Sequence, residues 1–238
     1  MNYPISEKYT DPKFQTMMMG PNPLKLQEEL LRGHGLPAGA RVLDLGSGQG
    51  LTSAVLAKEY GFHVYAADLW SDPEDNRRFF ASLGLTDAQI EPVRADATSL
   101  PFERDFFDAV VCTDAYNYFG RDAAFLDEKL LPFVRRGGRV FIAVPGMKKD
   151  LHDALPPALL LSWTPEQLDY IHDAAYWRAL FSQAAGAGIG RVEEMQINEE
   201  AWADWVACDN DYARGDKKSI DAGACRYLNF IAAELRRR

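Results

Sequence analysis

The stretch at residues 42–50, VLDLGSGQG, decides how this chain folds. An apolar run leads directly into three glycines on alternate positions, Gly46, Gly48 and Gly50. The next segment, 51–61, has apolar residues at the spacing of a helix. Glycines at the point where a strand passes into a helix let a ligand approach the backbone closely. The stretch therefore predicts a strand, a loop and a helix, with a ligand site in the loop.

The spacing of the glycines distinguishes between classes of ligand. A dinucleotide fingerprint reads G-x-G-x-x-G or G-x-G-x-x-A, but counting from Gly46 the last position is Leu51. A phosphate-binding P-loop needs lysine followed by serine or threonine, and QGLT at 49–52 has no lysine. The carboxylate of Asp44, two residues before the first glycine, would repel a pyrophosphate. We interpret the loop as a site for a ligand with a positive end and no phosphates.

Short apolar runs and helical patterns alternate along the chain. Strand-like runs lie at 41–45, 62–69, 90–96, 107–113, 138–145 and 189–198. Helical patterns lie at 51–61, 73–83, 123–134 and 174–187, and an amphipathic segment lies at 199–212. Because several runs are apolar on both sides, this alternation predicts a parallel sheet with helices on both faces. Ligands of such sheets bind at the carboxyl ends of the strands, which is where the glycines stand.

Residues at successive strand ends resemble those of the class I S-adenosylmethionine-dependent methyltransferases. The resemblance covers about residues 40–145 and rests on D-x-G-x-G-x-G at 44–50, Asp68, Asp96-Ala97, FDAVVCTDAYNYF at 107–119 and LPFVRRGGRVFIAVP at 131–145. Arg136 stands where the family often has proline. The branches it resembles are small-molecule enzymes, either cyclopropane-synthase-like or ubiquinone-methyltransferase-like.

The resemblance implies a fold and a cofactor. The fold is α/β, a Rossmann-like seven-stranded, mostly parallel sheet with helices on both faces and an antiparallel last strand. The candidate for that strand is 226–236, although its second half has helical propensity. The cofactor is S-adenosylmethionine, and the residues expected to bind it are Asp44, Gly46, Ser47, Gly48, Gly50, Asp68, Leu69, Asp96, Ala97 and Thr113.

Some of these residues have a specific expected role. The two oxygens of Asp68 can accept hydrogen bonds from both ribose hydroxyls. Asp96 is expected near the adenine amino group, although Asp-Ala-Thr-Ser could also simply begin a turn. Asp44 could instead be a buried acceptor that holds the loop.

Methyl transfer asks few things of the protein, because the sulfonium donor is already activated. The loop at 113–120 is expected to face the substrate, and Asp114 and Tyr116 are the candidate catalytic residues, since either could orient a nucleophile. Relatives often have a histidine where this chain has Asn117, which puts a histidine base at this position in doubt. The alternative for Tyr116 and Tyr118 is simple packing under a lid.

We expect a single domain, 1–238, made of an N-terminal cap (1–35), a cofactor-binding core (36–145), a lid (146–173) and a C-terminal part (174–238). The cap contains the run Met17-Met18-Met19, whose flexible side chains suit an adaptable cover or a core filler. The segment 147–173 is longer than a plain connection. Together with about the first 20 residues, it is expected to close over the cofactor and to form the acceptor pocket with Tyr116 and Trp163.

Composition restricts the partners. The net charge of −9 argues against nucleic acid. No window approaches 18 consecutive apolar residues, so no membrane span is expected. The chain starts without a signal-peptide core, and its three cysteines are scattered, which together predict a cytoplasmic protein. The histidines and cysteines lack ligand spacing, and CDNDYARGD at 208–216 lacks the closing glutamate of a calcium loop, so no metal is expected.

The expected function is methyl transfer from S-adenosylmethionine to a small molecule. An aromatic-rich, acidic C-terminal half suits an amine or an apolar acceptor. Three alternatives stay open: a non-catalytic protein that binds S-adenosylmethionine or S-adenosylhomocysteine, a lipid-modifying enzyme of the cyclopropane-synthase type, and an NAD-dependent dehydrogenase, which Leu51 and Asp44 disfavour. The sequence does not identify the acceptor or the oligomeric state.

Overall fold

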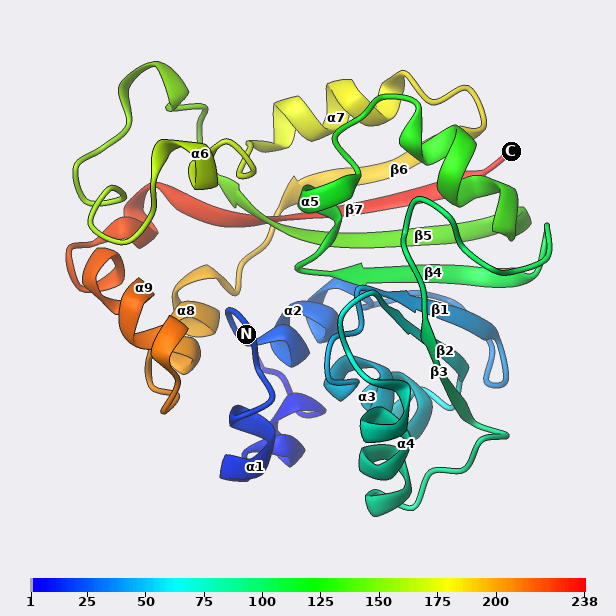
Figure 1. The fold of residues 1–238 in the computed structure, drawn as a ribbon. Coiled ribbons are helices and arrows are strands. Elements are labelled where there is room, and N and C mark those ends of the chain that lie inside the picture. Colours follow the sequence, from blue (N-terminus) through cyan, green and yellow to red (C-terminus); the bar gives the residue numbers. More distant parts are fainter. Residues whose placement is uncertain (1) are drawn as a thin grey trace.

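The computed structural model describes residues 2–238, which form a seven-stranded sheet in the order β3-β2-β1-β4-β5-β7-β6 (Figure 1). The strands are β1 (Arg41–Leu45), β2 (His63–Asp68), β3 (Ile90–Arg94), β4 (Phe107–Thr113), β5 (Val134–Met147), β6 (Ala187–Glu194) and β7 (Leu228–Arg237). Strand β7 runs antiparallel to both of its neighbours, whereas the pairs from β3 to β5 are parallel. The expected fold, with an antiparallel last strand, is confirmed.

Helices cover both faces of the sheet (Figure 1). They are α1 (Pro12–Gln15), α2 (Pro23–Leu30), α3 (Leu51–Glu59), α4 (Pro73–Ser82), α5 (Tyr116–Phe119), α6 (Pro165–Leu168), α7 (Ala174–Ser182), α8 (Asn198–Val206) and α9 (Asp211–Asp221). Val42 and Leu43 of β1 are both fully buried but belong to different apolar clusters, one with α2 and α3 and the other with α7. Neighbouring strand residues face opposite sides, so burial of both faces explains the unbroken apolar run.

Local signals fix several element boundaries. The side chain of Asn22 accepts hydrogen bonds from the backbone N–H groups of Leu24 and Lys25, and Asp72 caps α4 in the same way. Proline occupies the first helical position after each of these caps. The segment Leu228–Arg237 is extended despite its partly helical sequence, because its backbone pairs with β5 on one side and β6 on the other.

Two segments differ from the expectation. The pattern at 123–134 predicts one helix, but the structure has a short π-helical segment, Leu126–Leu130, and a 3-10 turn, Leu131–Phe133. Pro132 lacks the N–H that a continuing helix would need, and β5 starts directly afterwards at Val134. The sequence pattern also does not predict α9, which follows α8 after a short turn.

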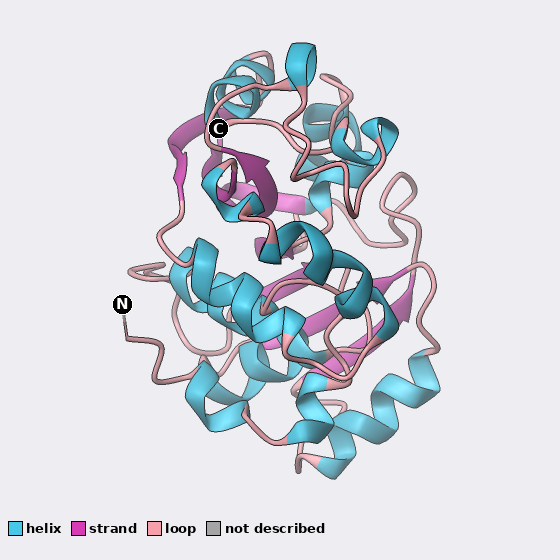
Figure 2. Ribbon diagram, turned by 90° about the vertical axis from the view of Figure 1, so that its left-hand side faces the viewer, coloured by secondary structure: helices cyan, strands magenta, loops and turns pink. Residues whose placement is uncertain are grey.

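The parallel strands end on the left side of Figure 1, and Figure 2 views the molecule from that side. Helices α5, α6, α8 and α9 and the N-terminal segment gather at this carboxyl edge, beyond the helices that flank the sheet. The carboxyl edge is therefore the part of the fold with the most added structure.

Between Asn2 and Arg238, no helix is long and apolar enough to cross a membrane.

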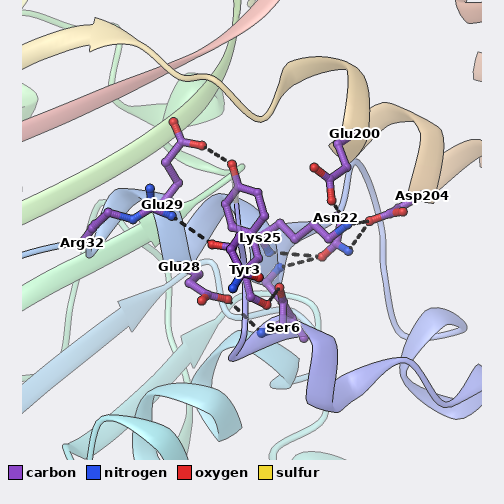
Figure 3. Close-up of polar contacts among 11 residues, drawn as sticks. Tyr3, Ser6, Asn22, Lys25, Glu28, Glu29, Arg32, Glu200 and Asp204 are labelled. Carbon is purple, nitrogen blue, oxygen red and sulfur yellow. Dashed lines mark hydrogen bonds and ion pairs between the residues drawn. The ribbon is translucent and has the colours of Figure 1, made fainter.

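The N-terminal segment is fastened to α8 by side chains (Figure 3). Lys25 Nζ lies 2.8 Å from Asp204 Oδ2 and also pairs with Glu200. The amide of Asn22 donates a hydrogen bond of 2.7 Å to Asp204. Buried Glu28 accepts hydrogen bonds from the N–H groups of residues 5 and 6, which ties the start of the chain to α2. This network holds α2 and the first residues as one fixed unit.

Candidate functional site

A cavity of about 720 Å³ opens at the carboxyl edge beside the glycine loop. Its wall consists of the loop at 46–49, the ends of β2, β3 and β4, and the residues around the start of α5. Met17, Met19 and Gly20 of the N-terminal segment complete it. A cavity of this size can bury most of a small organic ligand.

Most of the residues expected at the site meet in this cavity. Nine of them line it, namely Gly46, Ser47, Gly48, Asp68, Leu69, Asp96, Ala97, Thr113 and Asp114. They come from four strand ends that are separated in the sequence, and the parallel sheet brings these ends together. Asp44, Gly50 and Tyr116 do not line it.

Asp44 lies behind the cavity wall and is 1% exposed. Its Oδ2 accepts hydrogen bonds of 2.7 Å from Thr52 Oγ1 and 2.6 Å from Ser53 Oγ, at the start of α3. Burial raises the pKa of Asp44 to about 6, against the lowering effect of these two hydroxyls. This corrects the expectation of a cofactor-binding carboxylate: Asp44 is a buried acceptor that fixes α3 to β1.

The three positions of the loop are occupied by glycine for different structural reasons, although all three residues have positive φ. A Cβ on Gly46 would lie 2.5 Å from Ala115 Cβ, so this glycine lets the loop touch the segment before α5. A Cβ on Gly50 would lie 2.5 Å from the Phe80 ring. Gly50 therefore serves the packing of α3 on α4, which corrects its expected role at the ligand. Gly48 lines the cavity, and a Cβ there would meet nothing within 4 Å.

Asp68 organises the cavity wall at the end of β2. Its Oδ2 accepts a hydrogen bond of 3.0 Å from the Gly48 N–H. Its Oδ1 accepts from the N–H groups of Trp70 and Ser71 at 2.8 and 2.9 Å. The carboxylate thus holds the glycine loop and the loop after β2 in register. A carboxylate oxygen can accept more than one hydrogen bond, so both oxygens keep capacity for a ligand.

Asp96 stands in the turn after β3. Its Oδ1 accepts hydrogen bonds of 2.8 Å from both the N–H and the hydroxyl of Thr98. These bonds, the backbone one first, lower the pKa of Asp96. The side chain begins a turn and also lines the cavity, so the two interpretations of Asp96 are compatible.

Two hydroxyls in the cavity wall lack partners. Ser47 Oγ and Thr113 Oγ1 are buried, and neither has a hydrogen-bond partner within residues 2–238. Buried polar groups in native structures are nearly always hydrogen-bonded. Their position in the wall therefore indicates a polar ligand in the cavity.

Asp114 combines backbone strain with a carboxyl group whose pKa is raised. Its φ is +58°, a conformation that residues other than glycine seldom adopt and that often occurs at functional sites. A Cβ on Gly20 would overlap its carboxylate, so the N-terminal segment passes directly over it. Burial, and then the charge of Asp216, raise the pKa of Asp114 to about 7. A carboxyl group that titrates near neutral pH is suited to proton exchange.

Tyr116 does not face the cavity. It is fully buried and packs its ring edge-on against Phe125 and Trp177, with centroids 5.7 and 6.0 Å away. Tyr118, two residues later, is 66% exposed and lines the cavity. On the single turn of α5, residues two apart point to opposite sides. The expectation for Tyr116 is therefore corrected, and Tyr118 is the tyrosine at the site.

The expected lid packs on α9, and no residue of 147–173 lines the cavity. The Ser162 hydroxyl donates to the carbonyl of Gly215 at 2.8 Å, and the Ser219 hydroxyl donates to the carbonyl of Leu159 at 3.0 Å. Trp163 Nε1 donates to Asp216 Oδ1 at 2.8 Å. Only the N-terminal part of the expected cover reaches the cavity.

Sequence reasoning missed a residue that lines the cavity, Trp70. Trp70 is 84% exposed and lines the cavity, and its position directly after Asp68-Leu69 could have revealed it. In the described part of the chain, no group of three or more His, Cys, Asp or Glu residues could hold a metal ion.

The chain is similar to known methyltransferases. Residues 42–138 match a family model described as "Methyltransferase domain". Over 176 residues the chain is 36% identical to demethylmenaquinone methyltransferase of Clavibacter sepedonicus, a match that covers 67% of this chain and 69% of that protein. It is 30% identical over 115 residues to sarcosine/dimethylglycine N-methyltransferase of Aphanothece halophytica, covering 48% and 40%.

A solved structure shares the fold. Phosphoethanolamine N-methyltransferase 2 of Haemonchus contortus, in complex with S-adenosyl-L-methionine, superposes with a TM-score of 0.73 at 19% identity. The superposition covers 100% of this chain and 60% of that one. At this identity the likeness shows a common architecture and leaves the acceptor open.

Proposed function

The chain belongs to the class I S-adenosylmethionine-dependent methyltransferases, and from this premise we propose that its methyl acceptor is bound at the cavity beside Asp114 and Tyr118. The cofactor of this family is S-adenosylmethionine, and the acceptor is a small molecule. The observation that carries the proposal is one continuous cavity, whose wall includes both the glycine loop and the segment after β4. The methyl donor and the methyl acceptor can therefore lie in contact within this one cavity.

The residues of the cavity fit the cofactor. The unpartnered hydroxyls of Ser47 and Thr113 supply polar contacts that no protein group uses. Asp68 and Asp96 offer acceptors for hydroxyl and amino groups, and Gly48 leaves open space where a Cβ would stand. The residues proposed to hold the cofactor are Gly46, Ser47, Gly48, Asp68, Leu69, Asp96, Ala97 and Thr113.

The protein's share of the chemistry is positioning and proton removal. When bound, S-adenosylmethionine would supply a methyl group activated on a positively charged sulfur, and an acceptor with a proton on its nucleophilic atom would have to lose that proton. The Asp114 carboxylate stands in the cavity wall and, with its pKa raised to about 7, can receive that proton near neutral pH. Tyr118 offers a ring surface and a hydroxyl beside it. Alignment of nucleophile and methyl group can supply much of the rate enhancement.

Two measurements test this function. Calorimetry is expected to show binding of S-adenosylhomocysteine and no binding of NAD. Asp68→Ala is expected to weaken S-adenosylhomocysteine at least about tenfold, because hydrogen bonds to a charged group contribute about 1.5–3 kcal/mol each. Asp87→Ala, which removes an exposed carboxylate outside the cavity, is the matched control. Labelled donor, offered with amine, phenol, thiol and lipid acceptors, is expected to label at least one class. Binding without any transfer would identify a non-catalytic binder instead.

A further inference from the structure

Large apolar side chains that are exposed to solvent gather at the cavity. Met19 of the N-terminal segment, Trp70 after β2 and Tyr118 of α5 are all exposed, and all three line the cavity. Exposed apolar side chains that gather at one place mark a binding surface. Two of the three are aromatic, and aromatic rings pack favourably on flat aromatic partners. This part of the cavity wall therefore suits a ligand with an apolar, flat part.

The Tyr118 ring is exposed, but it is packed against a second ring. Its centroid lies 5.6 Å from the centroid of the Tyr170 ring, with 47° between the two planes. The Arg121 guanidinium carbon in turn lies 4.2 Å from the centroid of the Tyr170 ring. Contacts between aromatic rings, and between a guanidinium and a ring, are both attractive at these distances. Tyr118, Tyr170 and Arg121 thus form one arrangement, which we call the aromatic stack.

The aromatic stack is anchored in the lid segment. Arg121 Nη1 donates hydrogen bonds of 2.9 Å to both the backbone carbonyl and the Oδ2 of Asp169. The carbonyl of buried Leu168 accepts a hydrogen bond of 3.1 Å from His152 Nε2. These two residues directly precede Tyr170, so the bonds hold the backbone that carries its ring. The lid segment therefore supports a cavity-lining ring, although none of its own residues lines the cavity.

The charges of the cavity wall restrict the acceptor further. Among residues 2–238, no lysine, arginine or histidine lines the cavity, whereas the carboxylates of Asp68, Asp96 and Asp114 do. Arg121 lies outside the wall, and its guanidinium is paired with Asp169. An anionic group in the cavity would lose water, meet like charges and find no positive partner in the wall. The part of the acceptor that enters the cavity is therefore not an anion.

We propose that the methyl acceptor carries an aromatic ring that lies against Tyr118, and that Tyr170 holds Tyr118 in position for this ring. The inference rests on the proposed function and narrows its acceptor to molecules with a flat ring and no anionic group. Tyr118 touches the acceptor and is a specificity-determining residue. Tyr170 is a positioning residue, because it acts through Tyr118. A side chain that is already held in place loses less freedom on binding than a mobile one, so the aromatic stack strengthens the contact.

Three probes test the shape and the charge that the cavity accepts. 2-Naphthol, decahydro-2-naphthol and 2-naphthoate are titrated by calorimetry, at neutral pH, into the full-length protein saturated with S-adenosylhomocysteine. 2-Naphthol is expected to bind at least about threefold more tightly than decahydro-2-naphthol, which has the same carbon skeleton without a flat aromatic face. Because the saturated probe is the more apolar of the two, a merely greasy wall would bind it at least as tightly. 2-Naphthoate is expected to bind at least about tenfold more weakly than 2-naphthol.

Variants separate the two tyrosines. Tyr118→Ala is expected to weaken 2-naphthol about three- to tenfold and to change the S-adenosylhomocysteine affinity less than this. Tyr170→Ala is expected to weaken 2-naphthol about threefold in the wild-type background and to have no further effect when Tyr118 is already alanine. Tyr170→Phe keeps the ring and is expected to bind 2-naphthol like the wild type. Tyr212→Ala removes an exposed tyrosine that does not line the cavity, and it is the matched control.

The proposal is overturned if decahydro-2-naphthol or 2-naphthoate binds as tightly as 2-naphthol, or if 2-naphthol does not bind at millimolar concentration. It is also overturned if Tyr118→Ala leaves the 2-naphthol affinity unchanged. An equal loss from Tyr170→Ala with and without the Tyr118 ring would show that Tyr170 has only a structural role. If S-adenosylhomocysteine binds but labelled methyl appears only on aliphatic acceptors, the ring assignment fails while the proposed function stands. If S-adenosylhomocysteine itself does not bind, the proposed function fails first and this inference fails with it.

Discussion

The two sides of the cavity are built by different means. On the cofactor side, the glycine loop and the carboxylates of Asp68 and Asp96 bind backbone groups within about one βα unit, as in the bonds from Gly48 and Thr98. The elements around the acceptor side are held by contacts between distant parts of the chain. Asn22 reaches Asp204, 182 residues away, and the lid reaches α9 over more than 50 residues.

This difference has a consequence for function. A site built from backbone groups at strand ends changes little when side chains change, so it can keep one cofactor across a family. A site built from side chains of distant helices can change its acceptor without disturbing the sheet. We therefore expect the cofactor side to determine the methyl donor and the acceptor side to determine which molecule receives the methyl group.

The largest expected effect is on the cofactor side, at Gly46. Gly46→Ala adds a Cβ that would lie 2.5 Å from Ala115 Cβ, at a backbone φ of +79°. Strain and overlap together are expected to displace the loop and to weaken S-adenosylhomocysteine more than about 100-fold in calorimetry.

Gly84→Ala is the matched control for this change. Gly84 also has positive φ, +77°, but a Cβ there meets nothing within 4 Å and lies outside the cavity. Its backbone strain is expected to lower the free energy of unfolding by about 1–2 kcal/mol and to leave ligand binding unchanged. Equal loss of binding in both variants would show that backbone strain alone, rather than the contact with Ala115, controls the loop.

The same contrast explains which parts of the site the sequence predicts. The sequence can predict the positions of Asp68, Gly46 and Thr113. Each follows a strand, and the carboxyl ends of parallel strands lie at the same edge of the sheet, so the local pattern is enough to place them. Gly50 and Asp44 belong to the same motif, but they serve the packing of α3, as the Phe80 and Ser53 contacts show. A motif identifies the loop, whereas only packing shows which of its residues face the ligand.

Acceptor-side residues are harder to predict for a physical reason. Which of Tyr116 and Tyr118 faces the cavity depends on the rotation of the single turn of α5. The packing of Tyr116 against Trp177, which is distant in the sequence, sets this rotation. Asp216 meets Trp163 only when α9 packs on the lid segment. Neither outcome has a signature in the local pattern, because partners more than 50 residues away decide both.

The next largest effect concerns the charge of Asp114 and its dependence on pH. Its pKa is raised to about 7 in the folded protein, from 3.8 for the free side chain. The folded state thus keeps a proton that the unfolded chain loses from about pH 4 upward. Stability from the protonated carboxyl is complete below pH 4 and is lost as the pH rises through 7. Asp114→Asn, which also tolerates positive φ, is expected to be about 2 kcal/mol more stable than the wild type at pH 8 and equal at pH 4.

Asp105→Asn is the control, measured by denaturant unfolding at the same two pH values. Asp105 also has a φ of +58°, but it is exposed and pairs with Arg237. Its amide variant is therefore expected to be slightly less stable at pH 8. A gain for Asp105→Asn equal to that for Asp114→Asn would mean that the effect comes from the backbone conformation and not from the cavity.

A smaller effect is expected where the N-terminal segment meets α8. Lys25 is 14% exposed and pairs with Asp204 and Glu200, so Lys25→Met is expected to lower the free energy of unfolding by about 1–2 kcal/mol. Lys217→Met removes an exposed pair with Asp221 within α9 and is expected to change it by less than about 0.5 kcal/mol. Equal effects in chemical denaturation would mean that the contact of α2 with α8 is an ordinary surface pair and does not anchor the cap.

The smallest expected change is in the lid segment, 147–173, when the cofactor product binds. The hydrogen bonds of Ser162 and Trp163 fasten this segment to α9, and none of its residues lines the cavity. Its amide hydrogen exchange is therefore expected to change by less than about twofold with S-adenosylhomocysteine. Residues 17–20 are expected to exchange more slowly in the complex, because Met17, Met19 and Gly20 line the cavity and Gly20 lies against Asp114. Strong slowing across 147–173 instead would show that this segment closes over the cofactor, and the acceptor side would then be a moving cover rather than a fixed wall.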